Sequence, residues 1–273
     1  MQHKSSTLKS PWIFLSKGGK DQYINMFAQG SGGSITNTDD FCYGHSNQPI
    51  VLRGILKHKI MKRCLEQSRS FYYMDTGYFG NMPSGQNPNG WKLWHRIVHN
   101  DLQHSNIIPR PGDRLQKFGI SIPQRRYGSQ IIVAAPDDKP CRYYGIDRDQ
   151  WLADVLAHLS KVTDRPVVVR ERVRSRQHRV MQDPLNEVLK KDVHALVTFN
   201  SNSAVESILS GVPAFVLAPT HAAQPVSNMD LDQINNPIWP QDDLIYTWLC
   251  HLSYGQFHVN ELRDGTAYKL LQS

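Results

Sequence analysis

Residues 194–218, HALVTFNSNSAVESILSGVPAFVLA, decide the fold of this chain. An apolar run ends in the polar stretch 200–203, a helix-like stretch carrying Glu206 follows, and Gly-Val-Pro leads into a second apolar run. Short apolar runs bounded by turn residues indicate buried strands, and strands joined through a helix pair in parallel with a right-handed crossover. The segment therefore predicts a strand-helix-strand unit of an open parallel sheet.

The chain from residue 129 onward continues this alternation. Strands are predicted over 129–136 and 165–173, helices over 148–163 and 183–193, and two closing helices over 242–257 and 259–272. The part before residue 129 is less regular. Strands are predicted there over 11–19, 49–56 and 70–79, with a basic helix over 58–68. We therefore expect an α/β protein of two domains, 1–128 and 129–273, the first small and irregular.

The net charge of +7 is unevenly distributed along the 273 residues. Residues 1–128 hold 17 Lys and Arg against 7 Asp and Glu, a net charge of +10, whereas residues 129–273 hold 14 against 17, a net charge of −3. A basic half beside a slightly acidic half indicates different partners, the first a polyanion such as nucleic acid. The alternative is a solvated basic face without a partner.

Cysteine and histidine spacing indicates neither a disulfide framework nor a metal site. The four cysteines have no C-x-x-C pair, and we interpret His95, His99 and His104 as surface or core histidines, with no metal required. The chain shows no apolar stretch long enough for a signal peptide or a membrane span, so we expect a cytoplasmic protein without membrane contact.

The polar stretch after the strand at 194–199 is a candidate anion site. Ligands of open α/β sheets bind at the carboxyl ends of the strands, where helix N–H groups are available. Glu206 could then accept hydrogen bonds from ribose hydroxyls, and the alternative is an acidic residue favoured near a helix N-terminus. Arg170 and Arg172 follow a buried run and share one face, so they suit a diphosphate, unless they form a solvated basic edge. The polar residues expected to contact the phosphates are Asn200, Ser201, Asn202 and Ser203, with capping of the helix by Ser201 or Ser203 as the alternative.

The segment 194–218 is similar to the donor-binding segment of GT-B glycosyltransferases, among them capsular-polysaccharide-type and phage DNA transferases. The resemblance covers roughly residues 129–257. It implies two Rossmann-like domains that face a cleft, a nucleotide-sugar donor (a UDP-sugar above all) and no further cofactor. It also implies that Lys17, Gly18 and Gly19 form the glycine loop that approaches the donor phosphates.

Sugar transfer to a hydroxyl requires a general base beside the acceptor oxygen. Asp75, which follows a predicted strand and precedes Thr-Gly, is the leading candidate, and Asp101 is the second. The alternative for Asp75 is a turn residue that caps its own loop. The basic residues expected to contact DNA phosphates are Arg53, Lys57, Lys59, Lys62, Arg63, Arg125 and Arg126.

These observations favour an inverting, metal-independent glycosyltransferase that acts on a hydroxymethylated pyrimidine in double-stranded phage-type DNA. One alternative is a transferase acting on a surface polysaccharide. Another is a non-catalytic nucleic-acid-binding protein on a transferase-like scaffold. The sequence predicts neither the sugar nor the oligomeric state.

Overall fold

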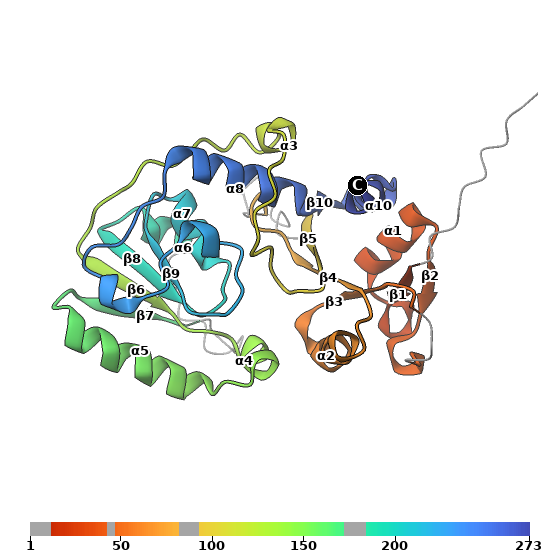
Figure 1. Ribbon diagram of the computed structural model, residues 1–273, viewed down its shortest axis with the longest axis horizontal. Coiled ribbons are helices and arrows are strands. Elements are labelled where there is room, and N and C mark those ends of the chain that lie inside the picture. Colours follow the sequence, from red (N-terminus) through yellow and green to blue (C-terminus); the bar gives the residue numbers. More distant parts are fainter. Residues whose placement is uncertain (1–11, 43–46, 82–92, 172–183) are drawn as a thin grey trace, which may run out of the picture. The chain divides into compact units, whose positions relative to one another are not determined.

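The computed structural model describes residues 12–42, 47–81, 93–171 and 184–273. The described chain divides into two compact units, drawn in Figure 1. One unit contains the residues up to Leu102 together with Ser253–Ser273, and the other contains residues 103–252. These boundaries differ from the expected division at residue 128 in two ways. The first unit ends at Leu102, and the end of the chain adds a strand and two helices to it.

The first unit is built on a sheet with the strand order β10-β5-β4-β3-β1-β2. Strands β1 to β4 are parallel, β5 pairs antiparallel with β4, and β10 pairs antiparallel with β5, so that β10 again runs in the direction of β1 to β4. The elements of this unit are β1 (Ile13–Leu15), α1 (Gln22–Ser31), β2 (Ser34–Thr36), β3 (Ile50–Arg53), α2 (His58–Glu66), β4 (Phe71–Thr76), β5 (Trp94–His99), β10 (Gln256–His258), α9 (Val259–Arg263) and α10 (Thr266–Gln272).

Helices α1, α9 and α10 cover one face of this sheet. Phe14, Val51 and Met74 come from three neighbouring strands and pack with residues of these helices, such as Phe27 and Leu262, in one buried cluster. Burial of such apolar side chains is the main favourable contribution to folding, about 1.5–3 kcal/mol for each large side chain. Helix α1 begins where the Asp21 carboxylate accepts hydrogen bonds from the N–H groups of Tyr23 and Ile24.

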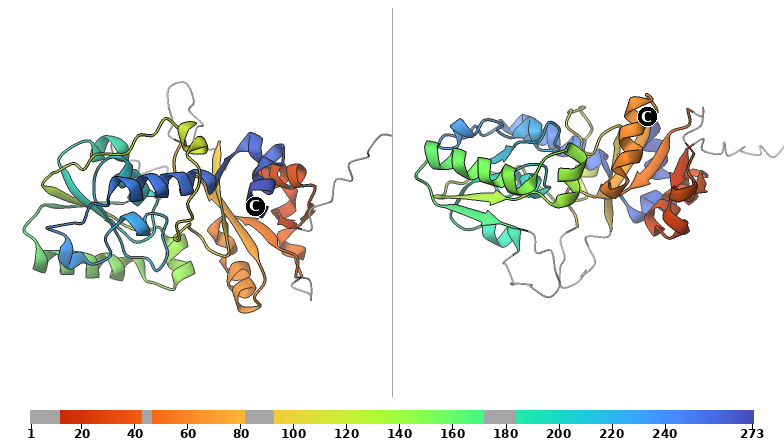
Figure 2. Two further views of the ribbon diagram at one scale, coloured as in Figure 1. Left: turned by 45° about the horizontal axis from the view of Figure 1, so that its top comes forward. Right: turned by 90° about the horizontal axis from the view of Figure 1, so that it is seen from below.

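The second unit is built on a wholly parallel sheet with the strand order β7-β6-β8-β9. Its elements are α3 (Asp113–Gln116), β6 (Gln130–Ala134), α4 (Asp138–Tyr144), α5 (Arg148–Val162), β7 (Val167–Arg170), α6 (Leu185–Leu189), β8 (Val193–Thr198), α7 (Ser203–Leu209), β9 (Ala214–Val216) and α8 (Asp242–Tyr254), whose last residues belong to the first unit. Helices α5 and α6 lie on opposite faces of this sheet (Figure 2). Both faces are therefore buried, as a parallel sheet requires.

Both sheets place their first four strands in the order second, first, third, fourth. In the first unit this order is β2-β1-β3-β4, and in the second it is β7-β6-β8-β9. The direction of winding reverses between the first and third strands, and ligands of open α/β sheets bind beyond the carboxyl ends of those two strands. The topology therefore selects one edge of each sheet as a candidate site.

Several elements differ from the sequence prediction. Helix α1 and strands β2, β5 and β10 were not expected, and α4 was missed in the second unit. The expected helix over 259–272 is two helices, because Gly265 adopts a left-handed conformation (φ 84°) between them. None of the described helices is long and apolar enough to cross a membrane.

Candidate functional site

The stretch 200–203 follows β8 at the carboxyl edge of the second sheet, as predicted, and two buried side chains hold its backbone. Gln103 donates from Nε2 to the carbonyl of Asn200 at 3.1 Å. His221 donates from Nε2 to the carbonyl of Ser201 at 2.9 Å, while its Nδ1 accepts from the N–H of Ala223 at 2.9 Å. Both nitrogens of this buried imidazole are satisfied only in the neutral tautomer with the proton on Nε2, so His221 acts as a fixed support of the loop.

The serine and asparagine side chains of this stretch have different environments. Ser201 Oγ accepts a hydrogen bond at 3.2 Å from the N–H of Ser203, the first residue of α7. Asn202 stands at the N-cap position but makes no side-chain capping bond. Asn200 and Ser203 are buried, and Ser203 Oγ has no hydrogen-bond partner among the described residues.

Glu206 and Arg170 both lie at this edge. Glu206 lies in the first turn of α7, and Arg170 ends β7, where it stands opposite Ala134 of the neighbouring strand. Burial raises the pKa of the Glu206 carboxyl, and the charge of Arg170 partly opposes this increase. The charge of Arg170 thus acts on the Glu206 carboxyl, whereas Arg172 lies outside the described residues.

Arg148 is a further cation at this edge that the sequence interpretation missed. Its guanidinium donates to the carbonyl of Pro136 just beyond β6 at 3.1 Å, and it pairs with Glu171 at 3.1 Å just beyond β7. It also donates to Asp149 at 2.6 Å. Arg148 therefore ties together the chain segments that leave two neighbouring strands. Its position in the first turn of a predicted helix gave no signal for this role.

The glycine loop of the first unit follows β1 directly. Residues Lys17–Gly19 form a short 3-10 helix in which Gly18 and Gly19 adopt left-handed conformations, with φ angles of 55° and 67°. The N–H of Gly18 donates to Asn37 Oδ1 at 2.9 Å. Lys17 is exposed and lies 3.6 Å from the carboxylate of Asp39, so the structure gives this lysine a surface partner.

Arg53 and Lys57 follow β3 and turn toward the end of β1. Arg53 Nη1 lies 3.4 Å from the Asp21 carboxylate, and its guanidinium stacks over the ring of Tyr23 at 4.6 Å. Lys57 Nζ donates to the carbonyl of Leu15 at 3.1 Å. These two residues were predicted to contact DNA phosphates, but the structure places them at the carboxyl edge of the sheet, where they contact Asp21 and Leu15.

Asp75 is the predicted base and lies near the carboxyl end of β4. Its Oδ1 accepts the N–H of Thr76 at 2.8 Å, and its Oδ2 accepts the hydroxyl of Tyr73 and lies 3.7 Å from Nη2 of Arg96. Burial by itself raises the pKa of this carboxyl. The charge of Arg96 and the hydrogen bonds from Tyr73 and Thr76 outweigh burial, so the pKa lies below its usual value. Asp75 is therefore ionised and held in one orientation at neutral pH.

Asp101, the second candidate base, lies beyond the end of β5. Because β5 is antiparallel to β4, its last residue, His99, stands opposite Tyr72 near the start of β4. Asp101 Oδ1 accepts the N–H of Leu102 at 2.6 Å. The two predicted bases thus follow strands of opposite direction, and Asp75 alone is placed at the carboxyl edge of the parallel strands.

The remaining basic residues fall in two places. Lys59, Lys62 and Arg63 are exposed on α2 in the first unit. The other two belong to the second unit, where Arg125 stacks over Tyr127 at 4.7 Å and Arg126 donates to the carbonyls of residues 189–191. Arg126 is therefore hydrogen-bonded to the chain at the end of α6. The exposed residues among the predicted DNA contacts of the first unit lie together on α2.

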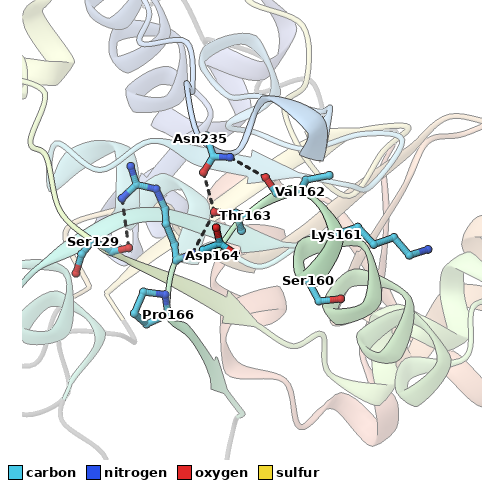
Figure 3. Close-up of a pocket in the computed structure, with 9 residues that line it drawn as sticks. Ser129, Ser160, Lys161, Val162, Thr163, Asp164, Pro166 and Asn235 are labelled. Carbon is cyan, nitrogen blue, oxygen red and sulfur yellow. Dashed lines mark hydrogen bonds between the residues drawn. The ribbon is translucent and has the colours of Figure 1, made fainter.

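A hollow of about 570 Å³ lies at the opposite edge of the second sheet (Figure 3). Ser129 and Pro166, which immediately precede β6 and β7, line it. Asn235 closes one side by hydrogen bonds to the carbonyl of Val162 and the hydroxyl of Thr163, both at 2.7 Å. Because this hollow lies at the amino ends of the strands, it is separate from the candidate site. In the described ranges no group of three or more His, Cys, Asp or Glu residues could hold a metal ion.

No family model and no curated protein matches this chain in sequence. Two solved structures that resemble it are transferases of KpsC from Thermosulfurimonas dismutans. The β-Kdo 2,4-transferase has a TM-score of 0.51 and 11% identity, with coverage of 89% of this chain and 90% of that chain. The β-Kdo 2,7-transferase has a TM-score of 0.50 and 10% identity, with coverage of 96% and 99%. At this identity the likeness establishes the fold, and the prediction of a GT-B-like α/β protein is confirmed.

Proposed function

We propose that this protein is a glycosyltransferase that moves a sugar from a nucleotide-activated donor to a hydroxyl group of a glycan. The observation that carries the proposal is the placement of a buried carboxylate, Glu206, and a cation whose charge acts on it, Arg170, at the carboxyl edge of the second sheet, beside the stretch 200–203. At this position the carboxylate can accept hydrogen bonds from the ribose hydroxyls of a nucleotide, and the arginine can bind its phosphates. The fold shared with two Kdo transferases supports the same class of reaction.

In the proposed reaction, the acceptor oxygen forms a bond to the anomeric carbon of the donor sugar as the bond from that carbon to the phosphate oxygen breaks. Arg170 offsets the negative charge that develops on the departing nucleotide. Asp75 accepts the proton of the acceptor hydroxyl. Because Arg96 lowers the pKa of Asp75, this carboxylate is a weak base, and orientation of the hydroxyl is the larger part of its role.

A glycan acceptor is favoured because both solved neighbours are Kdo transferases. The second candidate acceptor is double-stranded DNA with hydroxymethylated pyrimidines, which the exposed Lys59, Lys62 and Arg63 of α2 favour. The two candidates share the donor site and differ in the acceptor, so one set of donor experiments serves both.

Binding of the donor is tested first, by thermal shift with uridine, guanosine and cytidine nucleotide sugars, including an activated Kdo. We expect one nucleotide to raise the Tm, and we expect Glu206→Gln and Arg170→Gln to weaken its affinity about tenfold each, or 1.4 kcal/mol. Lys161→Gln, an exposed change at the opposite edge of the same sheet, serves as the matched control and retains the affinity. A chain that binds none of these nucleotides would not be a glycosyltransferase of this kind.

Transfer is then measured with the donor that binds, on acidic and neutral oligosaccharides and on hydroxymethylated duplex DNA, by mass spectrometry of the products. We expect a glycan product and a loss of activity of about a hundredfold or more in Asp75→Asn, in keeping with general-base catalysis. Full activity of Asp75→Asn would remove this residue from the base role. A product on DNA alone would select the second candidate.

A further inference from the structure

The carboxyl edge between β1 and β3 brings together two groups of residues that the sequence keeps apart. The loop after β1 ends in Asp21, β3 ends in Arg53, and the segment after β3 carries Lys57. Lys57 connects the ends of β3 and β1 by its hydrogen bond to the carbonyl of Leu15. Arg53 connects the end of β3 to the loop after β1 by its ion pair with Asp21. These contacts lie at the point where the winding of the first sheet reverses, which is where open α/β sheets bind ligands.

This edge gathers two cationic side chains, Arg53 and Lys57, in a partly buried place. Arg53 and Lys57 share one carboxylate, that of Asp21, which also caps α1 through its other oxygen. Burial lowers the pKa of the Lys57 ammonium, the charge of Asp21 opposes this, and Arg53 lowers it further. Within the described ranges, Lys57 donates to one acceptor, and Nε of Arg53 is buried without a hydrogen-bond partner. An anion at this place would supply an acceptor for Arg53 Nε and a charge that both cations attract.

The backbone at this edge leaves room for such a group. Gly19 and Gly54 follow β1 and β3, and both have left-handed φ angles, 67° and 82°. A Cβ atom built on either glycine would have no heavy atom within 4 Å, so the space beyond both strand ends is open. The amides of Gly18, Gly19 and Gly54 already donate to protein acceptors, which leaves the two cationic side chains as the donors for a ligand.

We propose that this edge binds one anionic group of the acceptor, a carboxylate or a phosphate, through Arg53 and Lys57. The assignment to the acceptor rests on the proposed function, because the charge of Arg53 also acts on Asp75, the residue proposed to accept the proton. An anion held by Arg53 would therefore anchor an acidic sugar or a phosphorylated acceptor beside the base. The guanidinium of Arg53 stacks on the ring of Tyr23, and this contact restrains it in the orientation in which it would bind the anion.

The test is an NMR titration of the full chain without any donor, at constant ionic strength, with inorganic phosphate, glucuronate and uncharged glucose as probes. We expect saturable shifts of the amides of Gly18, Gly19 and Gly54 with phosphate, glucuronate or both, and none with glucose. The anion that binds more tightly identifies the group that the acceptor carries. Arg53→Gln and Lys57→Met should each weaken the binding about tenfold or more, whereas Lys269→Gln, an exposed change on α10, should not.

Thermal unfolding of each variant shows whether it is folded, and Arg53→Lys, which retains the charge, is a second variant that should retain part of the affinity. The proposal is overturned if neither anion shows saturable binding, or if folded Arg53→Gln and Lys57→Met bind like the wild type. Because no donor is present, this outcome is independent of the donor site. If the protein binds an anion but transfers no sugar, the proposed function is rejected and the anion site at Arg53 and Lys57 is retained. If it transfers sugar but binds no anion, the proposed function is retained and the anion site is rejected.

Discussion

Arg96 stands directly opposite Asp75 in the antiparallel pair of β4 and β5, with its Nη2 atom 3.7 Å from the Asp75 carboxylate. The same guanidinium donates to the carbonyl of Thr76 at 2.8 Å and to that of Leu102 at 3.2 Å. Arg96 therefore holds both the carboxylate and the backbone that follows it. This buried arginine makes the end of β4 a rigid place for a charged side chain.

Asp75→Asn should lower the free energy of unfolding at pH 7 by about 1–2 kcal/mol, because it removes the charged partner of Arg96. The lowered pKa of Asp75 means that its ionised form stabilises the folded chain above the unfolded value of 3.8, and that this contribution is lost as the pH falls through the lower folded value. The difference between variant and wild type in urea unfolding should therefore shrink below pH 3.8. Asp39→Asn, an exposed change, is the control and should cost about 0.5 kcal/mol or less. A difference that stays constant with pH would contradict the ion pair.

Glu206→Gln should stabilise the protein above neutral pH while it weakens nucleotide binding. The raised pKa of Glu206 means that burial disfavours its ionised form, so stability is lost as the pH rises through the folded pKa. The variant does not ionise and should gain stability relative to wild type at pH 8 but not at pH 4, in denaturant titrations. A residue that costs stability and supports binding is typical of a functional site. Equal stabilities at both pH values would show that Glu206 is not held in a costly environment.

The sequence predicted the second sheet well because most residues of its strands are apolar. β6 and β8 are buried on both faces, so their residues read as continuous apolar runs, and helix α5 has a clear periodic pattern. β5 was missed because His95 and Arg96 are buried within it. Long-range contacts satisfy Arg96, and no local pattern reveals them. The assignment of α9 and α10 to the first unit is likewise decided by packing against α1, far away in the sequence.

The candidate site likewise contains residues whose position the sequence could predict and others whose position it could not. Arg170 and Glu206 could both be assigned in advance to the carboxyl edge of a parallel sheet, because apolar runs joined by helices predict parallel strands. Arg53 and Lys57 were grouped with Lys59 as predicted DNA contacts, since charge in a sequence does not tell which side chain turns toward a neighbouring strand. His221 gave no signal, because a single buried histidine that supports a loop 20 residues away has no motif of its own.

His221→Gln should weaken nucleotide binding about tenfold, because the bond to the Ser201 carbonyl that positions residues 200–203 is broken or displaced. We also expect a loss of roughly 2 kcal/mol of stability, as for other buried hydrogen-bonded residues. His194→Gln is the matched control, since His194 is a buried histidine of the same unit whose Nε2 bonds to the carbonyl of Ile234. Both variants should lose stability, and His221→Gln alone should lose affinity measured by calorimetry. Equal affinities of the two variants would show that the loop does not depend on His221.

Gly211→Ala should cost about 3 kcal/mol and prevent the chain from turning properly from α7 into β9. Gly211 has a φ of 78°, and a Cβ on it would lie 2.2 Å from the carbonyl oxygen of Gln124, so a strained backbone and a steric clash add together. Gly19→Ala is the control, with a similar φ of 67° but open space around the Cβ, and should cost about 1 kcal/mol. Chemical denaturation measures both values. Similar losses for the two variants would mean that the segment around Gln124 gives way without cost.

The exposed basic face of α2, formed by Lys59, Lys62 and Arg63, leads us to predict how the affinity for DNA depends on salt concentration. If duplex DNA is the acceptor, the logarithm of its affinity should fall linearly with the logarithm of salt concentration. Replacing all three residues by Gln should then reduce the slope by up to about 0.9 for each DNA phosphate that is no longer neutralised. A second triple variant, at Lys139, Lys161 and Lys269, changes the net charge equally on other exposed surfaces. The slope should be unchanged in that variant, because the number of neutralised phosphates and not the net charge determines it. Identical slopes for both triple variants would remove the structural support for DNA and leave the glycan as the acceptor.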